Sequence, residues 1–273
     1  MVDILLTTYN GEVFIKEQLN SIFNQTYKKW QILIRDDGSN DNTLNIVKEY
    51  QKKSPDKITI IQDDLGNIGA TLSFAELMQY SKNNYFMFCD QDDVWLNTKI
   101  EKSINAIKEI ELHYPELPIL VFTDLVEVDQ NLNILSESFI KKQKLFPEIT
   151  KSPVKSAALN VVAGCTCILN NKAISYILPI KSNRIVHDQW VTINIAKYGI
   201  VSFLDFPSLY YRQHNNNFVG ANNINGNYFL KKISSPIKQF SIYKDLIFNL
   251  NFKISIIAFL YYKFFFTLKR LYK

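Results

Sequence analysis

The fold of the amino-terminal half is decided by residues 3–49, which read DILLTTYNGEVFIKEQLNSIFNQTYKKWQILIRDDGSNDNTLNIVKE. Two short apolar runs lie in this stretch, Asp3–Thr8 and Gln31–Arg35. Each is followed by a segment whose apolar residues recur at helical spacing, the first of them being Glu12–Asn24. Strands that alternate with helices of this length predict βαβ units, in which neighbouring strands run parallel.

The same alternation continues to residue 112. Ile58–Ile61 and Tyr85–Cys89 are the next apolar runs, and Thr71–Tyr80 has helical spacing. A further helix is expected over Asn97–Leu112, with Asn97 as its N-cap. We therefore expect an α/β fold with a doubly wound, mainly parallel sheet.

The second half of the chain is less regular. A helix is expected over Asp188–Lys197, closed by Gly199, and the basic, proline-containing segment Lys141–Lys155 is interpreted as a surface loop. The expected strands are Ile119–Thr123, Leu132–Leu135, Val161–Leu169, Ile200–Phe206 and Ser208–Arg212. The simplest division is one α/β domain over residues 1–220 and a basic, aromatic-rich helical tail over residues 221–273.

Charge and cysteine content restrict the class of protein. The net charge is +5, but Tyr228–Lys273 contains nine Lys and Arg against Asp245 alone, so the rest of the chain is mildly acidic. This distribution argues against nucleic acid as a partner. Three cysteines argue against a disulfide framework and for a reducing compartment.

The ends of the chain bear on its location. The amino-terminal residues turn polar too soon for a signal peptide, and no uncharged apolar run approaches the roughly 20 residues that span a bilayer. We expect a cytoplasmic protein that is soluble or peripheral on the inner face of the cell membrane.

Polar clusters follow three of the expected strands. Thr7–Asn10 ends the first, Asp36-Asp37 ends the second, and Asp90-Gln91-Asp92-Asp93 ends the fourth. Ligands of open α/β sheets bind beyond the carboxyl ends of the strands. Crowded carboxylates need a positive charge to neutralise them, and Mg²⁺ typically bridges carboxylates and substrate phosphates. The pattern predicts a site for a metal and a phosphorylated ligand.

The motifs and their order resemble glycosyltransferase family 2, which has the GT-A fold of nucleotide-diphospho-sugar transferases. The resemblance covers about the first 220 residues. It rests on TTYNG at 7–11, NQTY at 24–27, DDGSNDNT at 36–43, GNIG at 66–69, DQDDVW at 90–95, HDQW at 187–190 and YYRQH at 210–214. The resemblance implies a transferase that takes a sugar from a nucleotide diphosphate donor.

The resemblance also implies roles for residues on the donor side. Tyr9 would stack on the nucleotide base, Thr7 would contact the nucleotide through its main chain, and Asp37 would bond to the pyrimidine imide. Asp90 and Asp92 match the family's aspartate-x-aspartate motif. Asp92 would bind a divalent metal, Mg²⁺ or Mn²⁺, and Asp90 would face the ribose or a metal-bound water.

Two later motifs complete the site that the resemblance implies. Asp188 would be the catalytic base of an inverting displacement, although an aspartate just before a helix also suits an N-cap. His214 would contact the metal or the diphosphate, and Arg212 is suited to phosphate. The acceptor side is assigned to Gly164, Thr166 and Trp190.

The donor sugar and the acceptor are less well defined. The chain is closest in pattern to bacterial rhamnosyltransferases of polysaccharide assembly, which suggests dTDP-rhamnose, with a UDP-hexose as the runner-up. Relatives that transfer rhamnose read HDWW where this chain has Gln189 before Trp190. The expected acceptor is a hydroxyl of a lipid-linked or saccharide molecule.

Two other functions fit some of the same features. A sugar-nucleotide pyrophosphorylase also has an α/β nucleotide site with metal-binding carboxylates, but Thr7–Gly11 is neither glycine-rich nor basic. A non-catalytic sugar-nucleotide binding protein would not need Asp188 beside the Asp90 and Asp92 pair.

The tail has two interpretations. Ile254–Tyr262 and Phe264–Phe266 are dense in large apolar side chains, and basic residues interrupt and follow them. Such helices either pack on the catalytic domain or dock on an anionic membrane surface.

Overall fold

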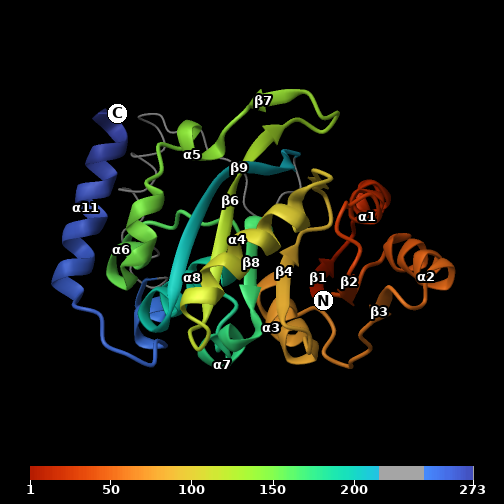
Figure 1. The fold of residues 1–273 in the computed structure, drawn as a ribbon, viewed down its shortest axis with the longest axis horizontal. Helices are drawn as coiled ribbons and strands as arrows, with labels where there is room; N and C mark the ends of the chain where they lie inside the picture. The colour runs from red at the N-terminus through yellow and green to blue at the C-terminus, as the bar shows by residue number, and fades with distance from the viewer. Residues whose placement is uncertain (215–242, 273) are drawn as a thin grey trace.

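The computed structural model describes residues 1–214 and 243–272, which form a mixed sheet with helices on both faces (Figure 1). Among these residues the strands lie in the order β3-β2-β1-β4-β8-β6-β9-β5, and β7 pairs with β6 at the side. Strand β1 (Val2–Thr8) is buried along its whole length and lies between β2 (Trp30–Asp36) and β4 (Tyr85–Cys89).

The amino-terminal half is the parallel βαβ sheet that the sequence predicts. Strands β1, β2, β4 and the short β3 (Ile58–Ile60) all run parallel. The helices between and after them are α1 (Ile15–Phe23), α2 (Thr43–Lys53), α3 (Ala70–Tyr80) and α4 (Lys99–His113). In the register, Thr8 lies beside Asp36 and Leu6 lies beside Cys89, so the three strands end together.

The start of α4 differs from its prediction. Helix α4 begins at Lys99 with Thr98 in the N-cap position, so Asn97 is not the N-cap. The Asn97 carbonyl instead accepts a hydrogen bond from the Thr26 N–H at 2.9 Å, which ties the start of α4 to the chain after α1.

The second half makes the sheet mixed. Strand β8 (Cys167–Asn170) runs antiparallel to both β4 and β6 (Ile119–Val128), while β9 (Ile200–Arg212) runs parallel to β6. Two short strands flank these, β5 (Val94–Trp95) and β7 (Ile134–Ser136). The parallel prediction therefore holds for β1–β4 and for the β6–β9 pair, but not for the whole sheet.

Two strand predictions in this half need correction. The two strands expected between residues 200 and 212 are one strand, β9, whose register against β6 shifts around Asp124. The strand expected over Val161–Leu169 begins only at Cys167, because Gly164–Thr166 form a turn of 3₁₀-helix, η2.

The segment Lys141–Lys155, predicted as a surface loop, is part of the folded core. It contains the end of α5 (Phe139–Lys142), the 3₁₀-helix η1 (Pro147–Lys151) and the start of α6 (Pro153–Ala158). Its apolar side chains are 4–6% exposed, namely Leu145, Phe146 and Ile149. They join the hydrophobic cluster on one face of the sheet, so the loop prediction is wrong.

Helix α8 (His187–Tyr198) confirms the helix expected from residue 188, and it follows η3 (Asn171–Ala173) and α7 (Ile174–Ile177). Gly199 caps it with a hydrogen bond to the Ile195 carbonyl at 2.8 Å. Its backbone is extended, with φ −152°, and a Cβ there would meet the Pro118 oxygen at 1.9 Å. Close packing against the end of the loop before β6, rather than a left-handed conformation, requires this glycine.

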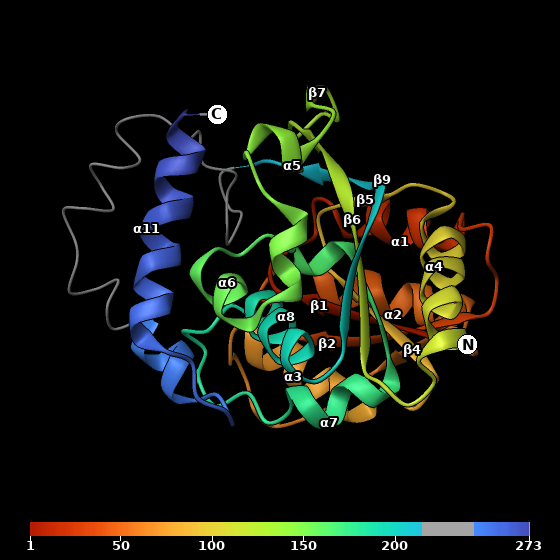
Figure 2. The same cartoon turned by 60° about the vertical axis from the view of Figure 1, so that its left-hand side comes forward.

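The described part of the tail packs on the catalytic domain. Helix α11 (Ile256–Tyr272) lies beside α6 in both cartoon views (Figures 1 and 2), and Phe259 and Phe266 on it are 2% and 4% exposed. In the described ranges, no helix has both the length and the apolar content needed to cross a membrane. Residues 221–242 of the predicted tail lie outside the described residues.

Candidate active site

The site is built on the loop that joins β4 to β5, residues 90–93. Because β4 lies beside β1, this loop stands next to the loop after β1. Gln91 fastens the two together: its Nε2 donates to the Tyr9 carbonyl at 2.9 Å and its Oε1 accepts from the Tyr9 N–H at 2.8 Å. A Cβ at Gly11 would lie 2.2 Å from the same Oε1, so this close contact requires glycine. The Tyr9 side chain is left 46% exposed at the surface.

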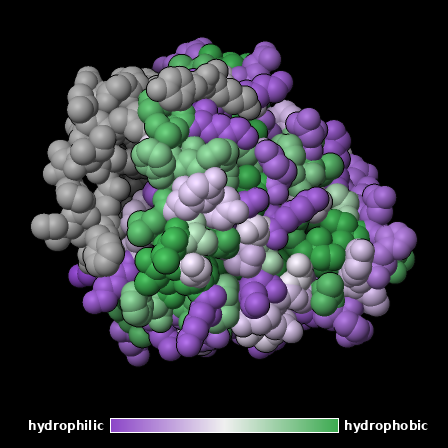
Figure 3. Space-filling view, turned by 90° about the vertical axis from the view of Figure 1, so that its left-hand side faces the viewer, coloured by the Kyte–Doolittle hydropathy of each residue, from purple (hydrophilic) through white to green (hydrophobic). Residues whose placement is uncertain are grey.

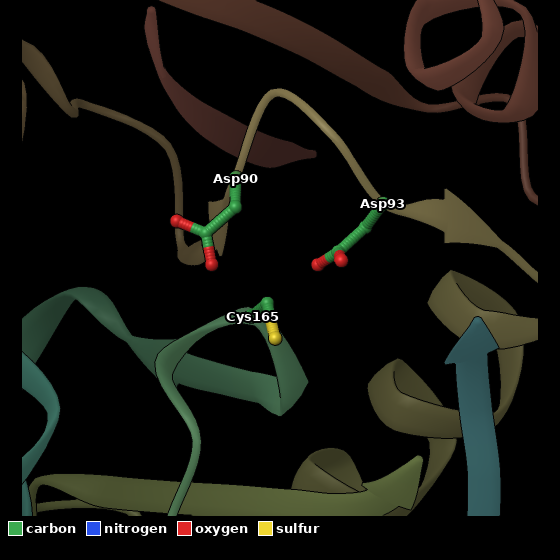
Figure 4. A group of neighbouring side chains, drawn as sticks. All are labelled: Asp90, Asp93 and Cys165. Carbon is green, nitrogen blue, oxygen red and sulfur yellow. The ribbon is translucent and has the colours of Figure 1, made fainter. Parts of the chain in front are cut away.

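Two carboxylates of this loop converge on a thiol. The ligand atoms of Asp90, Asp93 and Cys165 lie within 4.8 Å of one another, and Figure 4 shows the two carboxyl groups on one loop pointing toward the Cys165 sulfur. Asp93 is fully buried, and its Oδ2 has no hydrogen-bond partner among the described residues. Burial raises the pKa of Asp90 to about 7, with further contributions from the charges of Asp92 and Asp188. The cluster is therefore strained by like charges unless a cation is near.

A buried lysine supplies one positive charge beneath this cluster. Lys99 is fully buried, and its Nζ donates to the Cys165 carbonyl at 2.7 Å and to Ser208 Oγ at 3.0 Å. The ammonium also lies 4.7 Å from the centre of the Trp95 ring. Burial lowers the pKa of Lys99 to about 8, against the charge of Asp93, which raises it. The ammonium is a fixed counter-charge within the fold.

The third aspartate of the loop turns to the end of β9. Asp92 Oδ2 lies 2.8 Å from His214 Nε2, and both side chains are mostly buried, at 16% and 12% exposure. The His214 ring also packs against Phe14, with 4.9 Å between ring centres. Asp92 and His214, which are 122 positions apart in the sequence, thus form a polar pair beside the aspartate loop.

Asp188 lies in the first turn of α8 and is held by two donors. Asn160 Nδ2 donates to its Oδ1 at 2.8 Å, and the Gly164 N–H donates to its Oδ2 at 3.3 Å. The N-cap residue of α8 is Val186, so the N-cap interpretation of Asp188 is wrong. Burial raises the pKa of Asp188 to about 6, and these hydrogen bonds oppose the rise.

His187, the neighbour of Asp188, is buried. Its ring packs against Phe74 and Phe88, with ring centres 4.4 and 5.1 Å apart, and burial lowers its pKa to about 3. A Cβ at Gly164 would lie 2.4 Å from His187 Nε2. Glycine at position 164 therefore leaves room for the neutral, packed His187 ring, and the Gly164 N–H can still bind Asp188.

The side chains of Asp37 and Arg212 are occupied within the protein. Asp37 is 4% exposed and accepts from Arg35 Nη1 at 2.6 Å, from Ser73 Oγ, and from the N–H groups of Ile68 and Gly69. Arg212 is 2% exposed, and its guanidinium donates to the Asp92 and Gln130 carbonyls and to the Glu17 carboxylate. In this structure both side chains organise loops, and their contacts with a donor stay predictions.

The residues assigned to the acceptor side lie deep. Trp190 is 2% exposed and donates its indole N–H to the Ile177 carbonyl at 2.8 Å, which is a packing role. Thr166 is buried and bonds to the Ala163 carbonyl, and Thr7 is 8% exposed in β1. Gly164 reaches the site through its N–H to Asp188. Contacts of Trp190 and Thr166 with an acceptor stay predictions.

The structure adds three residues that the sequence analysis missed, namely Gln91, Lys99 and Asn160. Lys99 lies in an amphipathic helix, where lysine usually marks the solvent side, so its pattern gives no signal of burial. Gln91 sits inside the aspartate motif and could have been considered there. Asn160 has no local signal, because its partner Asp188 is 28 residues away.

This architecture defines a class of protein. A parallel βαβ half whose strand ends carry an aspartate-rich loop, joined to a mixed half that supplies a further carboxylate, is the GT-A fold of sugar-nucleotide-dependent transferases. The family model described as "Glycosyl transferase family 2" matches residues 3–151, which are more than half of the chain. The chain belongs to glycosyl transferase family 2 and is a glycosyltransferase.

Similar proteins refine this placement. The dTDP-rhamnosyl transferase RfbG of Shigella flexneri is 32% identical over 238 residues, which cover 80% of this chain and 74% of that protein. An Escherichia coli glucosyltransferase, WfgD, described as UDP-Glc:alpha-D-GlcNAc-diphosphoundecaprenol beta-1,3-glucosyltransferase, is 28% identical over 53% of each chain.

Solved structures agree on the fold. Staphylococcus aureus TarS 1–349 in complex with UDP-GlcNAc superposes with a TM-score of 0.65 at 19% identity, over 99% of this chain and 72% of that one. The mannosyltransferase PcManGT from Pyrobaculum calidifontis, in complex with GDP-Man and Mn²⁺, has a TM-score of 0.56 at 15% identity, over 80% of this chain and 58% of that one.

Proposed function

We propose that this glycosyltransferase inverts the anomeric carbon of its donor sugar, with Asp188 as the general base. One observation carries the proposal: the half-buried Asp188 carboxylate is held by Asn160 and the Gly164 N–H, close enough to Asp90 for its charge to raise the pKa of that group. A carboxylate oriented in this way beside the aspartate loop is placed to take a proton from an acceptor hydroxyl as the sugar–phosphate bond breaks.

The donor is proposed to be a nucleotide diphosphate sugar that binds along the ends of β1 and β4. The exposed Tyr9 ring is available for stacking on a base, and its backbone is fixed by Gln91. Likeness to RfbG over most of the chain favours dTDP-rhamnose. A UDP-hexose is the second candidate, supported by the likeness to WfgD over half of the chain.

A divalent cation, Mg²⁺ or Mn²⁺, fits the aspartate loop. The buried Asp93 Oδ2 lacks a partner among the described residues, and the pKa of the neighbouring Asp90 is raised by burial and then by the charges of Asp92 and Asp188. We expect Asp92 and His214 to hold the ion, with Asp90 beside them, because carboxylate oxygens suit these metals. When bound, the ion would stabilise the negative charge that develops on the departing diphosphate.

The acceptor is proposed to be a hydroxyl of a lipid-linked or saccharide molecule in cell-surface polysaccharide synthesis. The protein would act on the cytoplasmic side, where sugar nucleotides are available. Gln189 differs from the HDWW pattern of rhamnose-transferring relatives, and its Nε2 donates to the Ser156 and Ala157 carbonyls of α6. Gln189 thus links the first turn of α8, which carries Asp188, to α6, and this chain's acceptor is proposed to differ from that of the HDWW relatives.

A donor panel tests the assignment. dTDP-rhamnose, UDP-glucose, UDP-GlcNAc and GDP-mannose are added with and without Mn²⁺, and the melting temperature is measured. The proposal expects stabilisation by dTDP-rhamnose, or second by a UDP-hexose, that grows when the metal is present. Loss of this stabilisation in Asp92→Ala would support the role of the loop. Equal stabilisation by all donors, or by none, would contradict the donor assignment.

A further inference from the structure

Helix α11 carries apolar side chains on two faces, and the other described residues cover only one of them. Phe259 and Phe266 are 2% and 4% exposed and belong to the hydrophobic cluster shared with α6. Arg270 on the same side donates from Nε to the Gln143 carbonyl at 3.0 Å. These contacts anchor the helix on the domain, so its opposite face has a fixed orientation.

The opposite face is a stripe of exposed large apolar residues. Positions 257, 261, 264 and 271 repeat at helical spacing along one side of α11. The stripe consists of Ile256, Ile257, Leu260, Tyr261, Phe264, Phe265 and Leu271, which are 42–83% exposed. Figure 3 looks onto this side of the molecule, where hydrophobic residues gather beside hydrophilic ones. A contiguous exposed patch of this kind marks an interaction surface.

The charges around the stripe are positive. Residues 243–272 contain five Lys and Arg against a single acidic residue, Asp245, and α11 itself has no Asp or Glu. Asp245 is engaged by Arg184 at 3.4 Å. Lys253 before the helix is exposed, and Lys269 near its end is exposed as well, although its ammonium lies 4.1 Å from the centre of the Phe146 ring on the packed side of α11. Cations therefore stand near both ends of the helix.

We propose that this stripe docks on the surface of an anionic lipid bilayer, with α11 lying in the plane of the membrane. Apolar side chains would enter the headgroup boundary while the flanking lysines bind lipid phosphates, as in interfacial helices. The helix is not long and apolar enough to span a bilayer. A second copy of the chain fits less well, because it would oppose two basic faces.

Docking would set the position of the catalytic site relative to the membrane. Helix α11 packs on α6, and the carbonyls of Ser156 and Ala157 in α6 accept from Gln189, the neighbour of Asp188. The base would therefore stand at a fixed height above the lipid surface, which suits an acceptor anchored in it. This consequence rests on the proposed function, whereas the docking itself does not.

Vesicle binding of the full chain tests the proposal without any catalytic step. The protein is co-sedimented with vesicles of phosphatidylcholine alone and with vesicles that also contain phosphatidylglycerol. We expect binding to the anionic vesicles that is at least about tenfold stronger and that weakens with salt, given the contribution of each surface cation. Ile257→Ser with Phe264→Ser should reduce this binding at least about tenfold, because the apolar side chains that enter the lipid are lost.

Two controls separate the possible outcomes. Leu112→Ser, at an 81% exposed site on α4, changes a similar exposed residue far from the stripe and should bind as the wild type does. Sedimentation velocity measures the oligomeric state of each variant without lipid.

No wild-type binding to anionic vesicles, or equal binding by the stripe variant, would overturn the proposal. So would a wild-type dimer that the stripe variant converts to monomer without lipid binding. Transfer to a soluble acceptor should persist in the stripe variant, so failure of docking and failure of the proposed function are distinguishable.

Discussion

Asp188 works, in this account, as a base whose strength is set by its surroundings. An exposed carboxylate is a poor proton acceptor near neutral pH. Burial raises the pKa of Asp188 to about 6, and Asn160 with the Gly164 N–H keeps the ionised form oriented. The group is thus a stronger base than an ordinary aspartate and is still mostly ionised at pH 7.

Replacing this carboxylate by an amide should remove the base and keep the shape. We expect Asp188→Asn to lower turnover at saturating donor and acceptor by about 10²–10⁴-fold, the range of positioned proton transfer. The melting temperature should stay equal or rise, because a pKa raised in the folded state means that the ionised carboxylate destabilises the fold at neutral pH. Asp205→Asn, at an exposed site, is the matched control. A loss of less than about tenfold would move the base elsewhere.

The same pKa predicts a pH profile. Asp188 must be ionised to accept a proton, so turnover should fall as the pH drops through about 6 and should level off above it. The decline should approach about tenfold per pH unit on the acid side. Rates at saturating substrate between about pH 5 and pH 8 measure this, and a flat profile would contradict the assignment.

Lys99 should be needed for the stability of the aspartate cluster. Its buried ammonium is the fixed cation near Asp93, so Lys99→Met leaves buried carboxylates without that charge. We expect a loss of about 1–3 kcal/mol in the free energy of unfolding, because the Cys165 carbonyl and Ser208 Oγ lose their buried donor. Urea unfolding measures it, with Lys108→Met on the exposed face of the same helix as the control. Equal stability of the two variants would show that Lys99 carries no such role.

The sequence did not show in which direction the side chains of the site point. The motifs correctly placed the polar clusters at the ends of β1, β2 and β4, because parallel strands end together. They did not show that Asp37 and Arg212 turn into the protein to bind Arg35 and Glu17. Such partners come from distant segments, so no local pattern carries them.

At the scale of elements, prediction succeeded where burial follows a regular period. The strands of the first half are short apolar runs between amphipathic helices, and their parallel order is as expected. The prediction failed at Lys141–Lys155. The apolar residues of this segment follow no single period and lysines lie among them, so the sequence reads as a surface loop. The chain there packs on the sheet through short helices rather than running over the surface.

Phe146 tests this correction. Its ring is 4% exposed and lies 6.0 Å from the Phe266 ring of α11, so it links η1 to the tail helix. Phe146→Ala should lower the free energy of unfolding by about 3–5 kcal/mol because it leaves a cavity. Lys151→Ala, exposed at the end of the same segment, should change it by less than about 0.5 kcal/mol. Similar small effects of both changes in chemical denaturation would restore the loop interpretation.

At the scale of the whole molecule, the two halves of the fold contribute different parts of the reaction site. The parallel half supplies Tyr9 and the aspartate loop, and the mixed half supplies Asp188 on α8 and His214 after β9. Neither half holds the complete set.

Metal dependence tests whether these parts act together. Excess chelator should abolish transfer by the wild type, and Mg²⁺ or Mn²⁺ should restore it, because the charge on the leaving diphosphate would otherwise be unopposed. Asp92→Ala should abolish transfer in the presence of metal. Asp205→Asn serves as the exposed-site control. Full activity in excess chelator would defeat the assignment of the aspartate loop to a metal.

Release of nucleotide diphosphate from the donor tests most directly whether the protein transfers a sugar with Asp188 as the base. The purified chain is supplied with dTDP-rhamnose or a UDP-hexose, metal, and a lipid-linked acceptor extract. We expect release that requires the acceptor and that falls by about 10²–10⁴-fold in Asp188→Asn. Release that is independent of acceptor, or that is equal in the wild type and the Asp188→Asn variant, would contradict it.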